Sequence, residues 1–404
     1  MSSQSIDRGS LELGASNVAH QKRIEWPTWP QFGEEEYQAV ERVIRSNQLY
    51  AANEVKAFEA GFAEFVSSKY AVGVGNATQG LHLALAALGV GVGDEVIVTP
   101  YTWISSASCI LMQNAVPVFC DIEEESLGIN PAKLEACISE KTRAVILVHM
   151  FGYPARIHEV KKILDKRGIP LIEDASHAHG ACSRGQSIGS IGKIGVFSLH
   201  QRKALSVGDG GVLVTNDKQI FDKLHRLRSF GDEELSYNYR MSEFAAALGS
   251  VGLRKIAAQN RTREINYSML AEGLERCTEL RVLKPRVDER AVFYAVLLRV
   301  SNELDDFKLV GRLERLQASG IPIRKTWGLL HKHPHFNPAE KPARGRPWAD
   351  FGYSGQMSRC AYQEVKLPIA ESLCPDKILE FYVHPPAGER ELAFAIRHIR
   401  SEFG

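Results

Sequence analysis

Short apolar runs alternate with helical stretches between residues 70 and 215, and this alternation most restricts the fold. Within a run the residues are continuously apolar, so both faces of each strand are expected to be buried. Strands of this kind, each followed by a helix, are typical of a parallel sheet covered on both sides. The sequence therefore predicts an α/β fold with a mainly parallel, doubly wound sheet. The expected strands are 70–74, 95–98, 116–120, 143–148, 169–173, 195–198 and 211–215, and the expected helices are 33–47, 51–65, 78–88, 103–112, 131–138 and 157–167.

The pattern changes after residue 230. A long helix with at most one interruption leads into a strand and two further helices, at 243–276, 291–300, 304–318 and 389–403. This mixture predicts a smaller C-terminal α+β domain with a sheet of its own. The expected organisation is a polar, flexible arm over 1–25, a large domain over 26–260 and a small domain over 261–404, with a Pro- and Arg-rich exposed loop at 339–348.

Composition excludes several classes of protein. The 404 residues include 49 Lys plus Arg and 48 Asp plus Glu, so the formal net charge of +1 gives no reason to expect nucleic acid or a charged membrane as partner. The seven cysteines show no CxxC spacing, which argues against a zinc ribbon and fits reduced thiols. The polar N-terminus does not resemble a secretory signal, and no apolar run approaches the ~20 residues of a membrane helix. We therefore expect a cytoplasmic protein.

A glycine-rich turn, Gly73-Val-Gly-Asn-Ala-Thr-Gln-Gly80, lies between an expected strand and an expected helix. Backbone N–H groups at a helix N-terminus bind phosphate well. The turn is not a Walker A motif, which requires Gly-Lys-Ser/Thr, and it is not a GxGxxG motif, because position 78 is Thr. On the residues alone, a phosphate site and an ordinary tight turn are equally good interpretations.

Two charged side chains follow later strands. Asp174 ends an apolar run, and in open α/β sheets ligands bind beyond the carboxyl ends of the strands. The alternative role for Asp174 is the N-cap of a following helix, a position that Asp favours. Lys203 follows the strand that ends at Ser198 and lies between two strands that are expected to be buried. A Lys in such surroundings can lose its proton and form a Schiff base, although most Lys residues are simply solvated.

These features are more specific together than separately. The glycine-rich turn offers a phosphate site, Trp103 an aromatic ring, Asp174 a carboxylate and Lys203 an amine. Pyridoxal 5′-phosphate requires four such parts: a phosphate cradle, a ring stacked on the pyridine, a partner for the pyridinium nitrogen, and an amine that binds the aldehyde. The sequence therefore predicts a pyridoxal phosphate site.

The chain resembles the fold-type-I, pyridoxal phosphate-dependent aminotransferases of the DegT/StrS type, which aminate keto-sugars and cyclitol ketones. The resemblance extends from about residue 26 to residue 403. It is carried by Asn76-Ala-Thr-Gln-Gly-Leu-His-Leu-Ala-Leu, Gly93-Asp-Glu-Val-Ile-Val-Thr-Pro, Glu173-Asp-Ala-Ser-His-Ala-His-Gly, Phe197-Ser-Leu-His-Gln-Arg-Lys, Gly208-Asp-Gly-Gly and Tyr237-Asn-Tyr-Arg-Met-Ser-Glu-Phe. It implies transfer of an amino group from Glu or Gln to a nucleotide-linked keto-sugar or a cyclitol ketone, and leaves the identity of the ketone open.

The resemblance also implies roles for residues around the cofactor ring. Lys203 would hold the cofactor as a Schiff base and move protons, and Asp174 would pair with the ring nitrogen. Trp103 would stack on the ring. His177 would contact the 3′-oxygen, although relatives usually have Gln at this position; relatives also often have Glu where this chain has Asp209.

A further set of residues is implied for the phosphate group. Ala77, where relatives often have Gly, and Thr78 would bind it at the start of the helix, and Ser198 would add another hydrogen bond. Asn238 would reach the phosphate that the partner subunit binds. The resemblance therefore implies a homodimer with a shared active site.

Two histidine-rich segments could bind a metal ion or face the substrate. The segments are His331-Lys-His-Pro-His335 and His384-Pro-Pro. A metal site is the less favoured interpretation, and because relatives often place a His here beside the sugar, we expect His331 to face the substrate.

A sugar dehydratase on the same scaffold is disfavoured because Lys203 is present where such relatives carry His. A non-enzymatic regulator is disfavoured because every part of the site is present.

Overall fold

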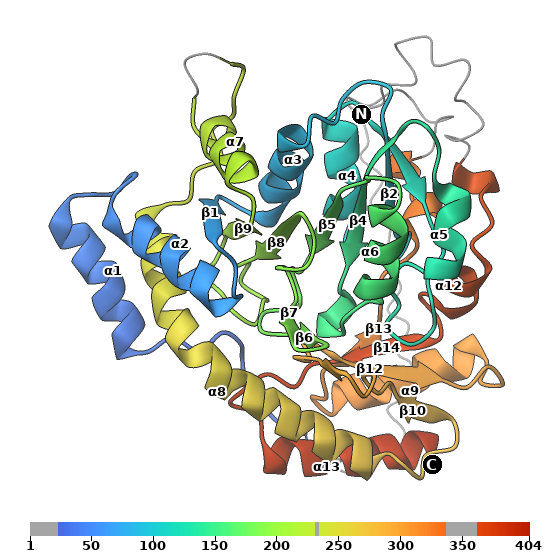
Figure 1. The fold of residues 1–404 in the computed structure, drawn as a ribbon. Helices are drawn as coiled ribbons and strands as arrows, with labels where there is room; N and C mark the ends of the chain where they lie inside the picture. Colours follow the sequence, from blue (N-terminus) through green and yellow to red (C-terminus); the bar gives the residue numbers. More distant parts are fainter. Residues whose placement is uncertain (1–22, 231–233, 337–361) are drawn as a thin grey trace, which may run out of the picture.

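A seven-stranded sheet forms the centre of the computed structural model (Figure 1), which describes residues 23–230, 234–336 and 362–404. Its strands are β1 (Tyr70–Val74), β2 (Glu95–Val98), β3 (Val116–Phe119), β4 (Thr142–Val148), β5 (Leu171–Asp174), β8 (Ile194–Ser198) and β9 (Gly211–Thr215). Their order is β1-β9-β8-β5-β4-β2-β3. The pairs from β8 to β3 are all parallel, whereas β9 is antiparallel to both β8 and β1. The expected, mainly parallel sheet is confirmed.

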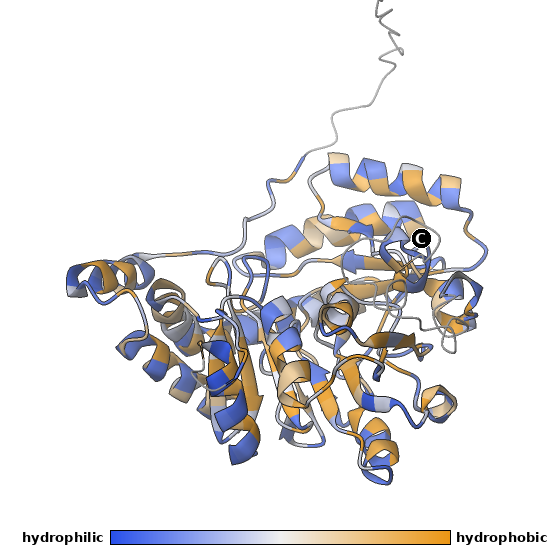
Figure 2. Ribbon diagram, turned by 90° about the horizontal axis from the view of Figure 1, so that it is seen from above, coloured by the Kyte–Doolittle hydropathy of each residue, from blue (hydrophilic) through white to orange (hydrophobic). Residues whose placement is uncertain are grey.

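Helices cover both faces of this sheet. Adjacent strand residues point to opposite faces, so Val96 and Val98 enter one apolar core and Ile97 the other. The first core includes α3 (Ala77–Ala87), α4 (Ser105–Met112) and α7 (Lys218–Arg228); the second includes α2 (Asn53–Phe65), α5 (Pro131–Cys137), α6 (Ile157–Asp165) and the start of α8 (Glu243–Gly273), with α1 (Glu34–Ser46) packed outside on α8. Apolar strands between helices with hydrophilic outer sides are visible in Figure 2. The doubly wound fold is confirmed.

A second sheet is formed by the C-terminal part of the chain. Its strands are β10 (Leu280–Val282), β12 (Val296–Val300), β13 (Ile323–Lys325) and β14 (Ile378–Phe381), and its helices are α9 (Asp306–Ala318), α12 (Pro368–Leu373) and α13 (Glu389–Phe403). The strand order is β10-β12-β14-β13, and all three pairs are antiparallel. This part is the α+β unit, with a sheet of its own, that the sequence predicts.

The long helix α8 runs from the large sheet to the C-terminal sheet (Figure 1). It is continuous over 31 residues, which agrees with the expected long helix with at most one interruption, and the expected domain boundary at residue 260 falls inside it. Neither α8 nor any other helix of the described ranges is both long and apolar enough to cross a bilayer. Of the expected arm, residues 1–22 lie outside the described residues, as does the expected loop at 339–348.

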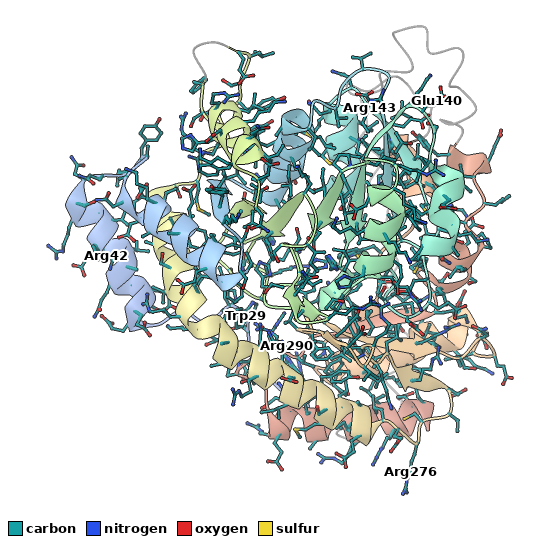
Figure 3. The ribbon with its side chains drawn as sticks, viewed as in Figure 1. Trp29, Arg42, Glu140, Arg143, Arg276 and Arg290 are labelled. Atoms are coloured by element: carbon teal, nitrogen blue, oxygen red, sulfur yellow. The ribbon has the colours of Figure 1, made fainter. Side chains whose placement is uncertain are left out.

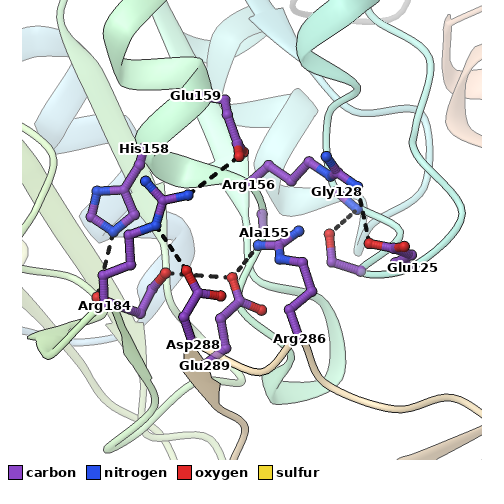
Figure 4. A network of polar contacts seen from close by, with 12 residues as sticks. Glu125, Gly128, Ala155, Arg156, His158, Glu159, Arg184, Arg286, Asp288 and Glu289 are labelled. Carbon is purple, nitrogen blue, oxygen red and sulfur yellow. Dashed lines mark hydrogen bonds and ion pairs between the residues drawn. The ribbon is translucent and has the colours of Figure 1, made fainter.

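A third, small sheet also joins the two parts. β6 (Cys182–Ser183) pairs with β7 (Gln186–Ser187) and with β11 (Glu289–Arg290) from the later chain. Arg184 Nε donates to Asp288 Oδ2 at 2.9 Å, and the Arg184 guanidinium lies 3.5 Å from Glu159 of α6 (Figure 4). Such exposed ion pairs each add little stability. They connect Asp288, in the segment before β12, to Arg184 and through it to α6.

Candidate active site

A cavity of about 830 Å³ lies where the parallel strands of the large sheet end. Carboxyl ends of parallel strands share one edge of the sheet, so loops that are distant in sequence meet there. From this edge the lining includes Ala77, Thr78, Trp103, Asp174, His177, Ser198 and Lys203, all of which the sequence singles out. From the C-terminal part it includes Tyr294, Arg324 and Trp327, which the sequence analysis missed.

The first turn of α3 forms one end of the cavity. Asn76 caps the helix, since its side-chain oxygen accepts a hydrogen bond from the Gln79 N–H at 3.0 Å. A Cβ on Gly211 would lie 2.6 Å from the Asn76 carbonyl carbon and 2.8 Å from the Ala77 nitrogen, so glycine is required for β9 to pass this closely. Thr78 Oγ1 lies 2.8 Å from Ser105 Oγ. N–H groups at the start of α3 and the hydroxyls of Thr78 and Ser105 thus gather at one end of the cavity, which suits an anion.

Asp174 lies at the end of β5 with a buried side chain. Its Oδ2 accepts a hydrogen bond from Ser106 Oγ of α4 at 2.7 Å, and its Oδ1 accepts one from the Ser176 N–H at 3.2 Å. Ser106 Oγ is in turn 2.9 Å from Thr102 Oγ1. The described chain continues after Asp174 in turns and not in a helix, so the N-cap alternative is wrong. The carboxylate is instead held in a fixed direction at the cavity.

Lys203 lies in the loop between β8 and β9. The loop is closed by backbone hydrogen bonds, among them the Lys203 N–H to the His200 carbonyl at 2.8 Å. Lys203 Nζ lies 4.9 Å from the centre of the Tyr294 ring. Burial lowers the pKa of Lys203 to about 8, although the charges of Asp174 and Glu380 act in the opposite direction. This amine therefore has an unprotonated fraction near neutral pH that an ordinary surface Lys lacks.

His177 is enclosed between aromatic rings. Its ring stacks on Tyr294 at 4.3 Å between centroids and on Phe151 at 5.7 Å. His177 Nδ1 accepts a hydrogen bond from the Phe151 N–H at 3.3 Å, which assigns the proton of the neutral ring to Nε2. Burial and the nearby charge of Lys203 hold the pKa of His177 well below its usual 6.5. His177 is therefore a neutral hydrogen-bond donor at the cavity.

Two more of the expected residues lie on the cavity wall and one lies outside it. Trp103, at the mouth, is 57% exposed and meets Trp327 edge to face at 5.6 Å. Ser198 ends β8, and its Oγ accepts a hydrogen bond from the His200 N–H at 3.3 Å. Asn238 is exposed and does not line the cavity of its own chain. Its reach toward a partner subunit stays a prediction.

His331 does not line the cavity either. Its side chain is fully buried, and its Nε2 lies 3.1 Å from Glu371 of α12. Because its polar contact is made inside the protein, the position does not support the expected contact with substrate. The described residues contain no group of three or more His, Cys, Asp or Glu side chains that could hold a metal ion.

The three missed residues come from the C-terminal part. Arg324 of β13 lies opposite Glu380 of β14 in the sheet register, and the two side chains form an ion pair. Arg324 also donates to the Tyr382 hydroxyl at 2.8 Å. Because β13 and β14 each contain a charged residue, neither strand is a continuous apolar run, and a search for apolar runs does not find them. The opposite charges of Arg324 and Glu380, which suit a cross-strand pair, are the signal that could have revealed them.

Comparisons with known proteins agree with this geometry. The model of the DegT/DnrJ/EryC1/StrS aminotransferase family matches residues 30–380. The L-glutamine:2-deoxy-scyllo-inosose aminotransferase of Streptoalloteichus tenebrarius is 32% identical over 362 residues, which cover 82% of this chain and 84% of the relative. The pleiotropic regulatory protein of Geobacillus stearothermophilus is 33% identical over 370 residues, which cover 85% and 94%. The X-ray structure of the aminotransferase from Psychrobacter cryohalolentis gives a TM-score of 0.81 at 30% identity, and the match covers 93% of this chain and 98% of that one. The chain therefore belongs to the DegT/DnrJ/EryC1/StrS aminotransferase family.

Proposed function

We propose that this aminotransferase uses pyridoxal 5′-phosphate to move an amino group from glutamine or glutamate to a ketone, carried by a nucleotide-linked keto-sugar or by a cyclitol. The observation that carries the proposal is the meeting of three features in one cavity: the amine of Lys203, the carboxylate of Asp174 and the N-terminus of α3. Each is suited to a different part of this cofactor.

The donor set of the cavity fits the polar groups of pyridoxal phosphate. The N–H groups of Ala77 and Thr78, with the Ser198 hydroxyl, suit the phosphate, and the turn is shaped by the close approach of β9. Asp174 suits the ring nitrogen and Lys203 the aldehyde. When bound, pyridoxal phosphate supplies an electron sink that stabilises negative charge on the carbon beside the substrate nitrogen.

The residues of this chain would then act as follows. Lys203 takes and returns a proton through Nζ, because a pKa of about 8 favours transfer in both directions near neutral pH. Asp174, oriented by the Ser106 hydroxyl, keeps a proton on the ring nitrogen through its negative charge. His177 donates a hydrogen bond from Nε2, and Trp103 shields one side of the site from water.

The substrate class is supported by the relatives and by the wall that faces the strand edge. The Streptoalloteichus relative is named for transfer from glutamine to a cyclitol ketone. In this chain the facing wall offers Arg324, Trp327 and Tyr294, which combine aromatic surface with hydrogen-bond donors as polyhydroxylated ligands require. A dehydratase is not favoured because Lys203 is present, and a regulator is not favoured because the site is complete.

We propose further that two subunits share each active site. The support is the position of Asn238, which is exposed outside its own cavity beside Tyr239, a residue of the cavity wall. In mixed Lys203→Ala and Asn238→Ala subunits, a shared site predicts partial recovery of activity, because each heterodimer has one site with both lesions and one with neither. If each site is built from one chain, every site retains a lesion and activity does not recover.

The function is tested by assaying purified holoenzyme with nucleotide-linked keto-sugars and cyclitol ketones, each with glutamine or glutamate as donor. Mass spectrometry of the products should show conversion of at least one ketone to an amine, and Lys203→Ala should not form it. Absence of an amine product from every combination, with a folded and cofactor-loaded wild type, would reject the proposed substrate class.

A further inference from the structure

A buried arginine of α8, Arg263, lies behind the loop that carries Lys203. Its side chain is 0% exposed, and burial lowers its pKa to about 9. Its described hydrogen-bond partners are all neutral: it donates to His384 Nδ1 at 3.0 Å, to Asn260 Oδ1 at 2.8 Å and to the Ala204 carbonyl at 3.4 Å. A buried cation without a counter-charge is costly to the fold.

Trp29 lies against the same guanidinium, beside α8 (Figure 3). The centre of its ring is 4.8 Å from Arg263 Cζ, and the ring stacks on His384 at 5.1 Å. Its Nε1–H donates to the Lys203 carbonyl at 2.9 Å. The carbonyls of two consecutive residues, Lys203 and Ala204, are thus held by side chains from two distant segments of the chain.

The same face of α8 also holds other parts of the site. Asn260 Nδ2 donates to the His179 carbonyl at 2.8 Å, in the turn that follows Asp174. Asn266 Nδ2 donates to the carbonyls of Val383 and Ala387 at 3.0 and 2.8 Å, on either side of His384. Residues three apart share a helix face. Asn260, Arg263 and Asn266 therefore connect the segments that carry Asp174, Lys203 and His384.

We propose that Trp29 and Arg263 are positioning residues for Lys203. By fixing two successive carbonyls they set the direction from which the Lys203 side chain enters the cavity, and His384 links this support to the C-terminal sheet. Neither residue lines the cavity, so both act through the loop and not on the substrate. The inference rests on the proposed role of Lys203 as the residue that holds the cofactor.

The test compares Trp29→Phe with Trp26→Phe in the holoenzyme. Trp29→Phe removes the indole N–H but keeps an aromatic ring beside Arg263. The control alters the same residue type in the same segment, where Trp26 packs edge-on against Phe381 at 5.5 Å. The readouts are the pH titration of the imine absorbance at about 410–430 nm, kcat, KM and the melting temperature.

Loss of one neutral hydrogen bond corresponds to a factor of roughly two to ten. For Trp29→Phe we expect kcat to fall by that factor at unchanged KM, and the titration midpoint to move by about 0.3–1 pH unit. The melting temperature should match that of Trp26→Phe. A wild-type midpoint and kcat in Trp29→Phe, or equal changes in both variants, would overturn the inference. A wild type without the imine band would reject the proposed function itself.

A second variant tests whether the two residues give one support. Arg263→Lys keeps the positive charge but cannot reach all three acceptors, so kcat and the titration midpoint should change as in Trp29→Phe. Because both residues hold the same loop, the double variant should lose less activity than the product of the two single losses. A loss equal to that product would show independent roles and contradict a shared support.

Discussion

The two walls of the active-site cavity are built in different ways. On one wall, Asp174, Lys203 and the α3 turn stand at the ends of strands that belong to one sheet. The facing wall takes Arg324 and Trp327 from a separate antiparallel sheet and its loops. The first wall carries the groups suited to a cofactor, and their relative positions follow from the strand order. The second takes its side chains from a separate part of the sequence, so we expect it to determine the choice of substrate.

Substitutions on the two walls are expected to affect different kinetic parameters. Substitutions on the strand-edge wall should lower kcat or remove the cofactor bond, whereas substitutions on the facing wall should mainly raise KM.

Lys203→Ala should have the largest effect. Removal of the amine removes both the bond to the cofactor and the proton carrier, so we expect kcat to fall by at least about 10²–10⁴. The matched control is Lys193→Ala, since Lys193 is partly exposed and pairs with Asp217 at 2.6 Å. Steady-state assays should find the control close to wild type. Normal turnover by Lys203→Ala would contradict the proposed role of Lys203 in the first wall.

Asp174→Asn should lower the rate with the fold nearly intact. Asn keeps an acceptor for the Ser176 N–H, and the Ser106 hydroxyl can turn to accept from the new amide. The lost charge corresponds to roughly a ten- to hundredfold slower kcat. Asp217→Asn is the control, because Asp217 caps α7 and Asn caps a helix about as well. A large drop in melting temperature with little loss of rate would assign a structural role to Asp174.

Arg324→Lys tests the facing wall. Lys keeps the positive charge beside Glu380 but loses the planar pair of donors that reaches both Glu380 and the Tyr382 hydroxyl. We expect KM for one substrate to rise by up to about tenfold, with kcat and the imine absorbance retained. Loss of the imine absorbance in Arg324→Lys would show that the facing wall also affects cofactor binding, which contradicts the proposed assignment of the two walls.

His177→Gln should have the smallest effect, because both side chains donate a neutral hydrogen bond. A His whose folded-state pKa lies well below 6.5 stays neutral as pH falls to 6.5, so the rate profiles of variant and wild type should coincide between pH 6.5 and 8. Below pH 6.5 an unfolded His gains a proton that buried His177 does not, so acid destabilises the wild type more. Thermal melting should therefore fall less on acidification in the variant. An ionisation near pH 7 that disappears in His177→Gln would contradict the neutral assignment.

The large sheet could be predicted because its strands are continuous apolar runs between polar turns. The C-terminal strands could not all be found in this way. β13 and β14 are short and contain Arg324 and Glu380, so they form strands because they pair with each other and not because of a local apolar pattern. Helix α7 was also missed, as it is largely hydrophilic and buries a narrow stripe around Leu224 and Leu227. The long helix α8 was expected, and it has no interruption. Gly249 lies inside the continuous helix α8, where a Cβ would lie 2.5 Å from the Phe58 ring.

The site residues, too, differ in whether a local sequence pattern or tertiary packing places them. Asp174 could be singled out because it directly follows a predicted strand, and Lys203 because it lies in the short loop after the next one; strand ends are where ligands bind. Tyr294 and Trp327 enter the cavity through tertiary packing against His177 and Trp103, which no local pattern records. The buried position of His331 could not be foreseen for a related reason: its pairing with Glu371 depends on how α12 packs, which the sequence does not reveal.

Chemical identification of the residue that holds the cofactor tests the proposed active site. Wild-type holoenzyme would be reduced with borohydride and digested, and the modified peptide would be located by mass spectrometry. We expect one pyridoxyl group per chain, on Lys203, and loss of the imine absorbance on reduction. A label on a different lysine, or an equal label in Lys203→Ala, would contradict it.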